Sequence, residues 1–318
     1  MNVKQTLGIG IKIIKAKVFK RKIPLKVTYH ITYRCNLSCP FCNRRTMDAP
    51  AEMNTIQVKE MMREFRGMGA CFWVFNGGEP LLREDLPELI DYAKDLGLHC
   101  SIVTNGVLLA EKLEKVPRFR KLDFVQVSLQ GPKEIHEKMC GYGTYDRIIE
   151  GLNLLKRLRI RTNILTLISG YNIEYFDGLI KLVAQYRMTI AFQPIIIQQS
   201  YNLEQYFPER ERYAEAVNSL IRRKRAGAHI SSSFEYLKML RDYQADIPNG
   251  MPCYASRLYC NVTPGGYLVP CCAKLAQAKP ENLGLKIGFK KAFEQLDDMH
   301  KCQDCYYFGP QELNIRLR

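Results

Sequence analysis

Six short runs rich in β-branched and aromatic residues recur through the first two-thirds of the chain. They are Val27–Thr32, Phe72–Asn76, Cys100–Thr104, Phe124–Leu129, Asn163–Ile168 and Thr189–Ile195. Amphipathic segments of helical period lie between them, among them Thr55–Gly67, Leu86–Leu96, Tyr145–Leu158 and Ile173–Tyr186. This alternation predicts a parallel sheet with helices outside it. Because six units are fewer than the eight that close a full barrel, we expect an α/β fold, a partial (β/α)6 barrel of the TIM type.

The last part of the chain differs in composition from these repeating units. Six of the twelve cysteines fall between residues 253 and 305, where helical periodicity fades. We therefore predict a basic N-terminal extension (1–24), the barrel (25–225), a helical linker (226–250) and a small Cys-rich C-terminal domain (251–318). The chain has no run of about 18 or more apolar residues, so it contains no predicted membrane-spanning helix.

The N-terminus carries much of the positive charge. Lysine and arginine exceed aspartate and glutamate by 47 − 32 = 15, and eight of these basic residues lie within residues 1–26, which contain no acid. A helix here has two interpretations: a foot on an anionic membrane surface, or a solvated helix that covers the bottom of the barrel, which we favour. Lysines interrupt the apolar residues too often for a secretory signal. We therefore expect a cytoplasmic protein, in which twelve cysteines indicate metal or redox chemistry rather than disulfides.

Three cysteines follow the first predicted strand in a C-x3-C-x2-C pattern, Cys35, Cys39 and Cys42. The loop after a barrel strand lies over the mouth, where ligands bind. Three thiolates can hold three irons of a [4Fe–4S] cluster and leave the fourth iron open to a ligand. Zinc is the alternative, but a structural zinc site takes four ligands, and the nearest fourth candidate, His30, lies back in the strand. The pattern therefore favours an iron–sulfur cluster.

The sequence CNLSCPFC at residues 35–42, together with NGGEP at residues 76–80, resembles the radical SAM superfamily. The resemblance covers about residues 25–200. It implies that the open iron chelates S-adenosylmethionine (SAM), that an electron from the cluster cleaves the sulfonium, and that the resulting 5′-deoxyadenosyl radical abstracts hydrogen from a substrate. In this interpretation the three cysteines are the catalytic cluster ligands.

The resemblance also implies roles for residues at the strand ends. Phe41 would lie beside the adenine, and Gly77 and Gly78 would let the backbone approach the ligand without a Cβ clash. Glu79 would accept a hydrogen bond from the ammonium group of SAM, and Pro80 would fix the turn that aims it. Further candidates for contacts with SAM, each at a later strand end, are Asn105, Ser128 and Gln193.

One position departs from the family pattern. Many relatives have an arginine after the fourth strand, a candidate partner of the SAM carboxylate, where this chain has Cys140. Lys138 or Arg147 could replace that arginine. Cys140 itself is either a hydrogen-atom donor to a substrate radical or a free structural thiol, and we favour the thiol.

A second pattern, Cys253-x12-Gly266-x4-Cys271 followed by Cys302-x2-Cys305, resembles the SPASM and twitch modules appended to radical SAM barrels. It implies a second, auxiliary [4Fe–4S] cluster with four thiolates and no open iron. Because few residues follow Cys305, we expect the shorter twitch form.

The ligand set of this second site is not unique. Cys272 is an alternative to Cys271, and Cys260 is expected to be a core residue. Zinc is an alternative metal, because four cysteines ending in C-x2-C also suit zinc. The glycine pair Gly265-Gly266 predicts a hairpin turn that brings the cysteine-bearing segments together.

These motifs predict an oxygen-sensitive radical SAM enzyme that acts on a peptide or on a small-molecule or cofactor precursor. The resemblance implies a flavodoxin- or ferredoxin-like electron donor, and the basic surface would help an acidic donor to dock. The competing class is a zinc-bearing, basic nucleic-acid-binding protein. That class leaves the GGEP sequence and the three-cysteine loop unexplained, and no groove-reading motif supports it.

Overall fold

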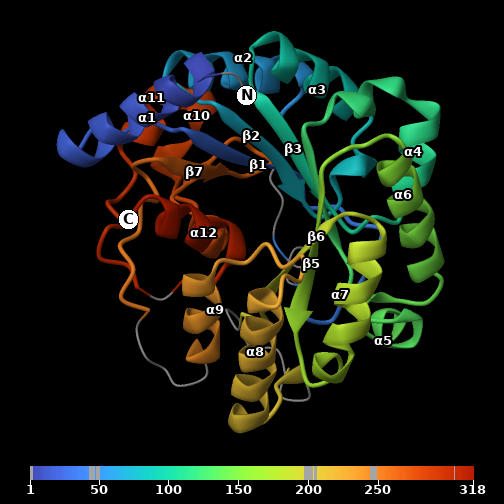
Figure 1. Cartoon of the computed structure of the whole chain (residues 1–318). Helices are drawn as coiled ribbons and strands as arrows, with labels where there is room; N and C mark the ends of the chain where they lie inside the picture. The colour runs from blue at the N-terminus through green and yellow to red at the C-terminus, as the bar shows by residue number, and fades with distance from the viewer. Residues whose placement is uncertain are drawn as a thin grey trace.

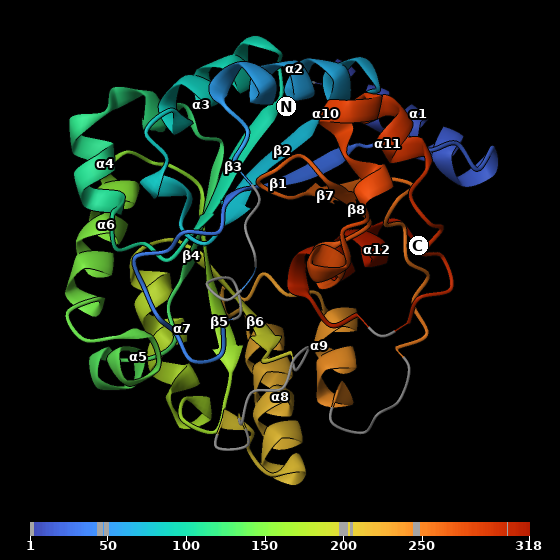
Figure 2. The same cartoon turned by 180° about the vertical axis from the view of Figure 1, so that it is seen from behind.

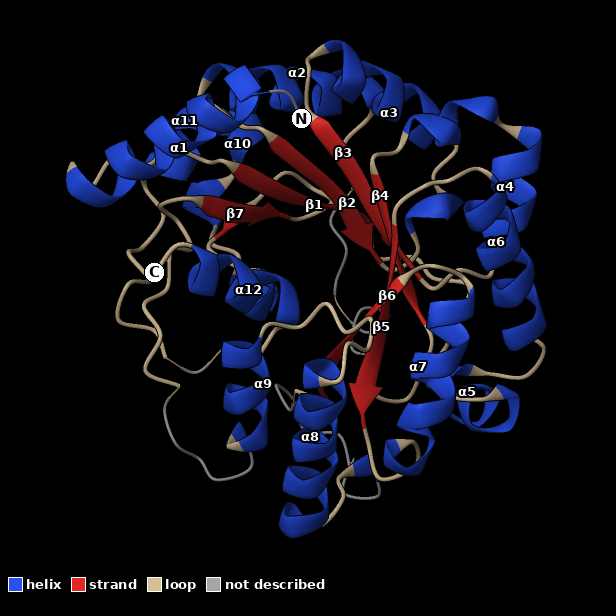
Figure 3. Cartoon of the chain, in the orientation of Figure 1, coloured by secondary structure: helices blue, strands red, loops and turns tan. Residues whose placement is uncertain are grey.

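A computed structural model describes residues 3–42, 47, 51–196, 203, 206–243, 249–303 and 305–318. A sheet of eight strands in the order β6-β5-β4-β3-β2-β1-β7-β8 forms its centre, and helices surround the sheet on the outside (Figure 1, Figure 3). The strands are β1 (Lys26–Thr32), β2 (Phe72–Gly77), β3 (His99–Thr104), β4 (Phe124–Ser128), β5 (Thr162–Ile168), β6 (Thr189–Pro194), β7 (Tyr259–Val262) and β8 (Leu268–Val269).

The helices follow the strands in the expected alternation. Those within the barrel are α2 (Thr55–Gly67), α3 (Leu86–Asp95), α4 (Leu109–Lys115), α5 (Lys133–Cys140), α6 (Tyr145–Arg157) and α7 (Phe176–Gln185). The remaining helices are α1 (Val3–Val18), α8 (Arg210–Arg225), α9 (Phe234–Arg241), α10 (Gly284–Ile287), α11 (Phe289–Glu294) and α12 (Phe308–Arg316).

Strands β1 to β6 are parallel, and each pairs with the next along the chain. The six predicted strands and four predicted helices are therefore confirmed, with small differences at their ends. The sheet remains open, since β6 and β8 are its two edges. The partial α/β barrel expected from six units is the observed fold.

The Cys-rich C-terminal segment continues the barrel sheet. Strand β7 pairs in parallel with β1, from Lys26 opposite Tyr259 to Tyr29 opposite Val262, and β8 pairs antiparallel with β7. The predicted hairpin is thus confirmed, and from behind it lies beside β1 with α10, α11 and α12 beyond it (Figure 2). The buried His30 Nε2 lies 2.9 Å from Asn261 Oδ1 across this pair. The four-part domain division stays a prediction, and residues 244–248 of its linker lie outside the described residues.

Helix α1 lies at the amino ends of the strands. Its Lys12 Nζ donates to the carbonyl of Gly69, just before β2, at 2.9 Å, and Ala16 is fully buried. Lys17 Nζ donates to the carbonyl of Leu317 at 2.6 Å, which ties the helix to the C-terminus. This packing agrees with a helix that covers the bottom of the barrel, and it concerns only the buried face of α1. Among the described residues, no helix has the length and apolar character needed to cross a membrane.

Trp73 anchors the core between β2 and α2. It is fully buried, with its ring centroid 6.1 Å from that of Phe65 and 6.3 Å from that of Phe75. Its Nε1 has no hydrogen-bond partner among the described residues. The side chain therefore stabilises the fold through packing rather than through a polar contact.

We predict that Trp73→Ala lowers the free energy of unfolding by about 3–5 kcal/mol, because it leaves a large cavity. Trp73→Phe should cost clearly less, since it keeps an aromatic ring and removes a buried, unpaired N–H group. Urea unfolding followed by circular dichroism measures both. An alanine variant as stable as the phenylalanine variant would contradict this role.

Candidate functional site

A cleft of about 300 Å³ lies at the carboxyl ends of the parallel strands. The loop after β1 contributes Cys35, Cys39 and Cys42, together with Phe41. The other predicted residues that line the cleft come from the ends of β2, β3, β4 and β6 and are Gly77, Gly78, Asn105, Ser128 and Gln193. The fold thus brings the predicted site residues of the barrel to one place, apart from Glu79 and Pro80, which do not line the cleft.

Hydrogen bonds within the cysteine loop, and others from the residue that follows β3, fix the conformation of this loop. Leu37 N–H donates to Cys35 Sγ at 3.4 Å, and Cys42 N–H donates to the carbonyl of Cys39 at 3.0 Å. Asn105 Nδ2 donates to Asn36 Oδ1 at 2.8 Å and lies 3.8 Å from Cys35 Sγ. Burial raises the pKa of the Cys35 thiol. Cys35 and Cys39 are half-buried and Cys42 is exposed, so the loop presents thiols to the cleft.

The donor set of this loop fits an iron–sulfur cluster with one open iron. None of the twelve cysteines forms a disulfide, and Cys35, Cys39 and Cys42 line the cleft together. Within the described residues, no three His, Cys, Asp or Glu side chains already stand at the distances of a bound metal ion. The fit therefore rests on the kind and placement of the donors: soft thiols bind iron–sulfur clusters, and three of them leave a position open.

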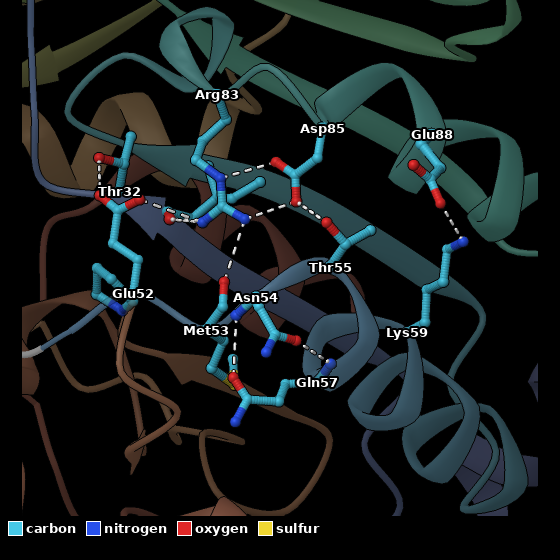
Figure 4. A network of polar contacts seen from close by, with 12 residues as sticks. Thr32, Glu52, Met53, Asn54, Thr55, Gln57, Lys59, Arg83, Asp85 and Glu88 are labelled. Atoms are coloured by element: carbon cyan, nitrogen blue, oxygen red, sulfur yellow. Dashed lines mark hydrogen bonds and ion pairs between the residues drawn. The ribbon is translucent and has the colours of Figure 1, made fainter.

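Arg83 fastens both ends of the segment that carries the cysteine loop (Figure 4). Its side chain is only 8% exposed, and its guanidinium donates to the carbonyl of Ile31 at 3.1 Å and of Met53 at 3.2 Å. Asp85 pairs with it through two contacts of 2.8 and 2.7 Å, and Glu52 lies at 3.3 Å. Burial opposes ionisation of Asp85, but hydrogen bonds from Arg83 and Thr55 hold its pKa below the usual value.

Sequence reasoning missed Arg83, although it follows GGEP by three residues with Asp85 two residues further on. A buried cation needs fixed carboxylates and carbonyls around it. These partners come from three separate segments of the chain, so no local pattern reveals them.

Gly77 and Gly78 are required by the backbone of β1. A Cβ on Gly77 would lie 2.2 Å from the carbonyl oxygen of Thr32, and one on Gly78 would lie 2.2 Å from that of Arg34. Gly78 N–H donates to Thr32 O at 2.8 Å, which continues the β1–β2 pairing into the cysteine loop. Both glycines also line the cleft. The two glycines are therefore required by the backbone at the end of β1, whether or not a ligand also approaches them.

Glu79 is fully buried and joins the end of β2 to the end of β3. Its Oε1 accepts from Thr104 Oγ1 at 2.8 Å and from Leu81 N–H at 3.0 Å, and its Oε2 accepts from Asn105 N–H at 2.8 Å. Burial raises its pKa to about 7, although these hydrogen bonds oppose the shift. In this arrangement the carboxylate positions Asn105, and its predicted contact with an ammonium group stays a prediction.

His136 is a cleft residue to which the sequence assigned no role. Its Nδ1 accepts from Gln130 N–H at 3.1 Å, so the ring proton resides on Nε2. That Nε2 has no hydrogen-bond partner among the described residues. Burial lowers the pKa of His136 to about 4, so the ring is neutral near pH 7. It thus presents one uncharged donor beside the cleft.

Cys140 lines the cleft next to the cysteine loop. Cys39 Sγ lies 3.9 Å from the carbonyl oxygen of Cys140. The hydrogen bond with Cys39, together with burial, raises the pKa of the Cys140 thiol. Lys138 and Arg147 do not line the cleft, and Lys138 Nζ instead lies 4.2 Å from the ring centroid of Tyr171. Their proposed pairing with a SAM carboxylate stays a prediction.

The side of the cleft formed by β5 and the end of β6 is apolar, and the C-terminal segment builds part of it. Leu165, Leu167, Ile195 and Tyr307 line this wall. Phe308 N–H donates to the side-chain oxygen of Gln193 at 2.9 Å, which holds Tyr307 against the barrel. Sequence reasoning missed Tyr307, because it has no motif beyond its position two residues after Cys305. Leu167 and Ile195 belong to the same apolar cluster as Leu37 and Phe41 of the cysteine loop, so the apolar lining of the cleft reaches that loop.

The second set of cysteines gathers beside the barrel. Cys253 and Cys271 are buried in one cluster, against which Cys302 packs. Burial raises the pKa of Cys305, and the charges of Cys272, Cys271 and Cys253 add to this effect. The four predicted ligands are thus neighbours, and Cys272 remains an alternative because it lies among them. Cys260 is fully buried within β7 in the main core, as expected.

Comparisons with known proteins agree with this geometry. A family model described as the Radical SAM superfamily matches residues 29–183. The "PqqA peptide cyclase" of Xanthomonas axonopodis pv. citri is 28% identical over 258 residues, which cover 78% of this chain and 68% of that protein. The "AdoMet-dependent heme synthase" of Oleidesulfovibrio alaskensis is 31% identical over 160 residues, which cover 49% of this chain and 41% of that protein.

Solved structures share the fold. Streptococcus suis SuiB bound to the precursor peptide SuiA superposes with a TM-score of 0.68 at 17% identity, over 92% of this chain and 71% of that one. The enzyme anSMEcpe, with bound AdoMet and the Cp18Cys peptide, gives 0.67 at 19% identity, over 87% of this chain and 82% of that one. At these identities the likeness establishes the architecture alone.

The raised pKa of Glu79 predicts a pH dependence of the apoprotein's stability. Between about pH 4.5 and about pH 7 the folded state binds more protons at Glu79 than the unfolded state does, so this group makes the free energy of unfolding fall as pH rises. We predict that Glu79→Gln removes this slope. Taking the difference between wild type and variant cancels the opposite contribution of His136.

Thr104→Val is the matched control for this measurement. It removes one hydrogen bond that favours the carboxylate but keeps the titrating group. The fall in the free energy of unfolding should therefore continue to a higher pH than in the wild type. Denaturation across this pH range measures all three proteins. A constant difference between wild type and Glu79→Gln would contradict the assignment.

Proposed function

The chain belongs to the radical SAM superfamily, and we propose that it is a peptide-modifying member in which Cys35, Cys39 and Cys42 hold the [4Fe–4S] cluster. The observation that carries this proposal is the placement of these three cysteines on one cleft together with the ends of the neighbouring strands. The competing class, a zinc-bearing nucleic-acid-binding protein, accounts neither for the family match nor for this cleft.

Cys35, Cys39 and Cys42 would hold the cluster, which would supply the electron for reductive cleavage of SAM. The chain's own residues prepare the site. Asn105 orients the loop around Cys35, and Glu79 in turn fixes the backbone of Asn105. The apolar wall, with Leu167 and Ile195, excludes water from the space where a reactive radical would form.

A peptide is the substrate class that the relatives support best. The peptide cyclases align over 78% of this chain, whereas the heme synthase aligns over 49%. The apolar wall, to which Tyr307 contributes, would receive an apolar part of such a substrate.

Further parts of the proposal concern the partners. Cys253, Cys271, Cys302 and Cys305 would hold an auxiliary [4Fe–4S] cluster, since four thiolates saturate such a cluster. A flavodoxin- or ferredoxin-like protein would supply the electron. An oxygen-sensitive cluster, and twelve cysteines that form no disulfide, suit the cytoplasm. The N-terminal segment would make a peripheral membrane contact.

The decisive experiment is anaerobic reduction of the reconstituted protein with SAM present. We predict that wild type forms 5′-deoxyadenosine and that Cys39→Ala forms none, because two thiolates do not retain the cluster. Cys71→Ala is the matched control, since this half-buried thiol lies near Lys12 of α1, away from the cleft, and this variant should retain activity. Product formation by Cys39→Ala would refute the assigned ligands.

To find the substrate, peptides encoded next to the gene can be incubated with the reduced enzyme and SAM. A loss of hydrogen from one peptide, matched by 5′-deoxyadenosine, would support the peptide class. Modification only of small precursors would favour the other class.

Iron content tests the auxiliary cluster separately. We predict about eight iron atoms per reconstituted chain and about four in Cys302→Ala, with 5′-deoxyadenosine still formed. Cys260→Ala is the control that should keep the full iron content, because Cys260 lies in the main core. About four iron atoms together with one zinc in the wild type would instead identify the second site as zinc.

A further inference from the structure

Helix α1 presents a row of apolar side chains to solvent. Leu7, Ile11, Ile14 and Val18 are 63%, 54%, 58% and 66% exposed, and Phe19 just after the helix is 67% exposed. Their spacing of four, three and four residues places Leu7 to Val18 on one face of the helix. Of the nine large hydrophobic side chains exposed among the described residues, five belong to this row. A concentration of this kind marks an interaction surface.

The opposite face of α1 is the one that folds against the barrel. Ala16 is fully buried, and Ile13 packs against the same cluster as Cys253. Lys12 and Lys17 are fastened to carbonyl groups of the body at 2.9 and 2.6 Å. The residues of the exposed row leave more than half of their surface outside this packing, and folding alone does not account for them.

Positive charge surrounds this row. Lys15, Lys20 and Arg21 are exposed beside it, and the chain contains no acidic residue before Asp48. A hollow of about 300 Å³ lies along one flank of the helix, where Lys12, Arg66, Lys94 and His99 are among its lining residues. Its one carboxylate, Asp123, is paired with Lys94 at 2.5 Å. Since Lys94 is paired and burial lowers the pKa of His99, the positive charge of this flank comes from Lys12 and Arg66.

We propose that α1 is an interfacial anchor that lies in the plane of an anionic membrane surface, with the row from Leu7 to Phe19 immersed and the basic flank against the lipid phosphates. An exposed apolar face bordered by lysines is the pattern of helices that bind in this way. A second copy of the chain fits less well, because the same face on two copies would bring Lys15, Lys20 and Arg21 against their counterparts. This inference builds on the proposed peripheral contact and is independent of the peptide substrate.

Docking of this kind leaves the active-site cleft accessible. Helix α1 contacts the residues before β2, at the amino ends of the strands, whereas the cleft lies at their carboxyl ends. The surface would therefore hold the enzyme by the closed end of the barrel. A substrate and an electron donor would reach the mouth from the other side.

Sedimentation with lipid vesicles tests this surface on the full chain. The wild type should sediment with vesicles of phosphatidylcholine and phosphatidylglycerol, and less with phosphatidylcholine alone. The double variant Ile11→Ser/Ile14→Ser should bind roughly tenfold more weakly, because both apolar side chains are lost from the row. Lys15→Glu should bind several-fold more weakly to the anionic vesicles only. Ile56→Ser, at a 69% exposed position of α2, is the matched control and should bind as wild type does.

Two controls keep the test decisive. Circular dichroism checks that each variant is folded, and 5′-deoxyadenosine formation should be unchanged in all of them, so a failure of membrane binding is separable from a failure of the proposed chemistry. No binding to anionic vesicles, or binding that the double variant retains, would overturn the proposal. A wild-type dimer that the double variant dissociates, seen by light scattering, would assign the row to a second copy and also overturn it.

Discussion

The close approach of β1 and β2 at their carboxyl ends determines the rest of the site. Gly78 N–H donates to Thr32 O at 2.8 Å, and Glu79 N–H donates to Arg34 O at 2.9 Å. The two backbones lie so close that neither Gly77 nor Gly78 has room for a Cβ. The pairing of the two segments thereby continues past the end of the strands, up to the residue before Cys35. The cysteine loop therefore begins at a fixed point of the cleft. Arg83 fixes the other end of this segment through its hydrogen bond to the carbonyl of Met53.

Among the described residues, no Lys, Arg, Asp or Glu lines the cleft. Arg83 is matched by Asp85 and Glu52, while Glu79 is buried among three donors that favour its ionised form. Fixed charges and hydrogen bonds of this kind hold strand ends in place without offering an exposed acid or base to a reactive intermediate. The apolar lining from β5 and β6 continues into Leu37 and Phe41 of the cysteine loop, while Asn105 and Ser128 contribute polar lining at the ends of β3 and β4.

The sequence predicted those features that rest on local patterns. Strand and helix periodicity identified the barrel, and two cysteine patterns identified the residues that gather at two places. Contacts between distant segments were missed. Nothing near Tyr259 shows that β7 adds to β1, and nothing near Tyr307 shows that it reaches the cleft. The ligand contact expected of Glu79 stays a prediction. Its hydrogen bond to Thr104 was missed, because it depends on a residue 25 positions away along the chain.

The central claim is that three protein thiolates hold the cluster and that no side chain occupies its fourth iron. The most direct test is the electron paramagnetic resonance spectrum of the reduced protein before and after addition of SAM. The account predicts that SAM changes the spectrum in wild type and in Cys140→Ala alike. A wild-type spectrum that is indifferent to SAM, and becomes sensitive only when Cys140 is removed, would show that this thiol caps the cluster and would contradict the account.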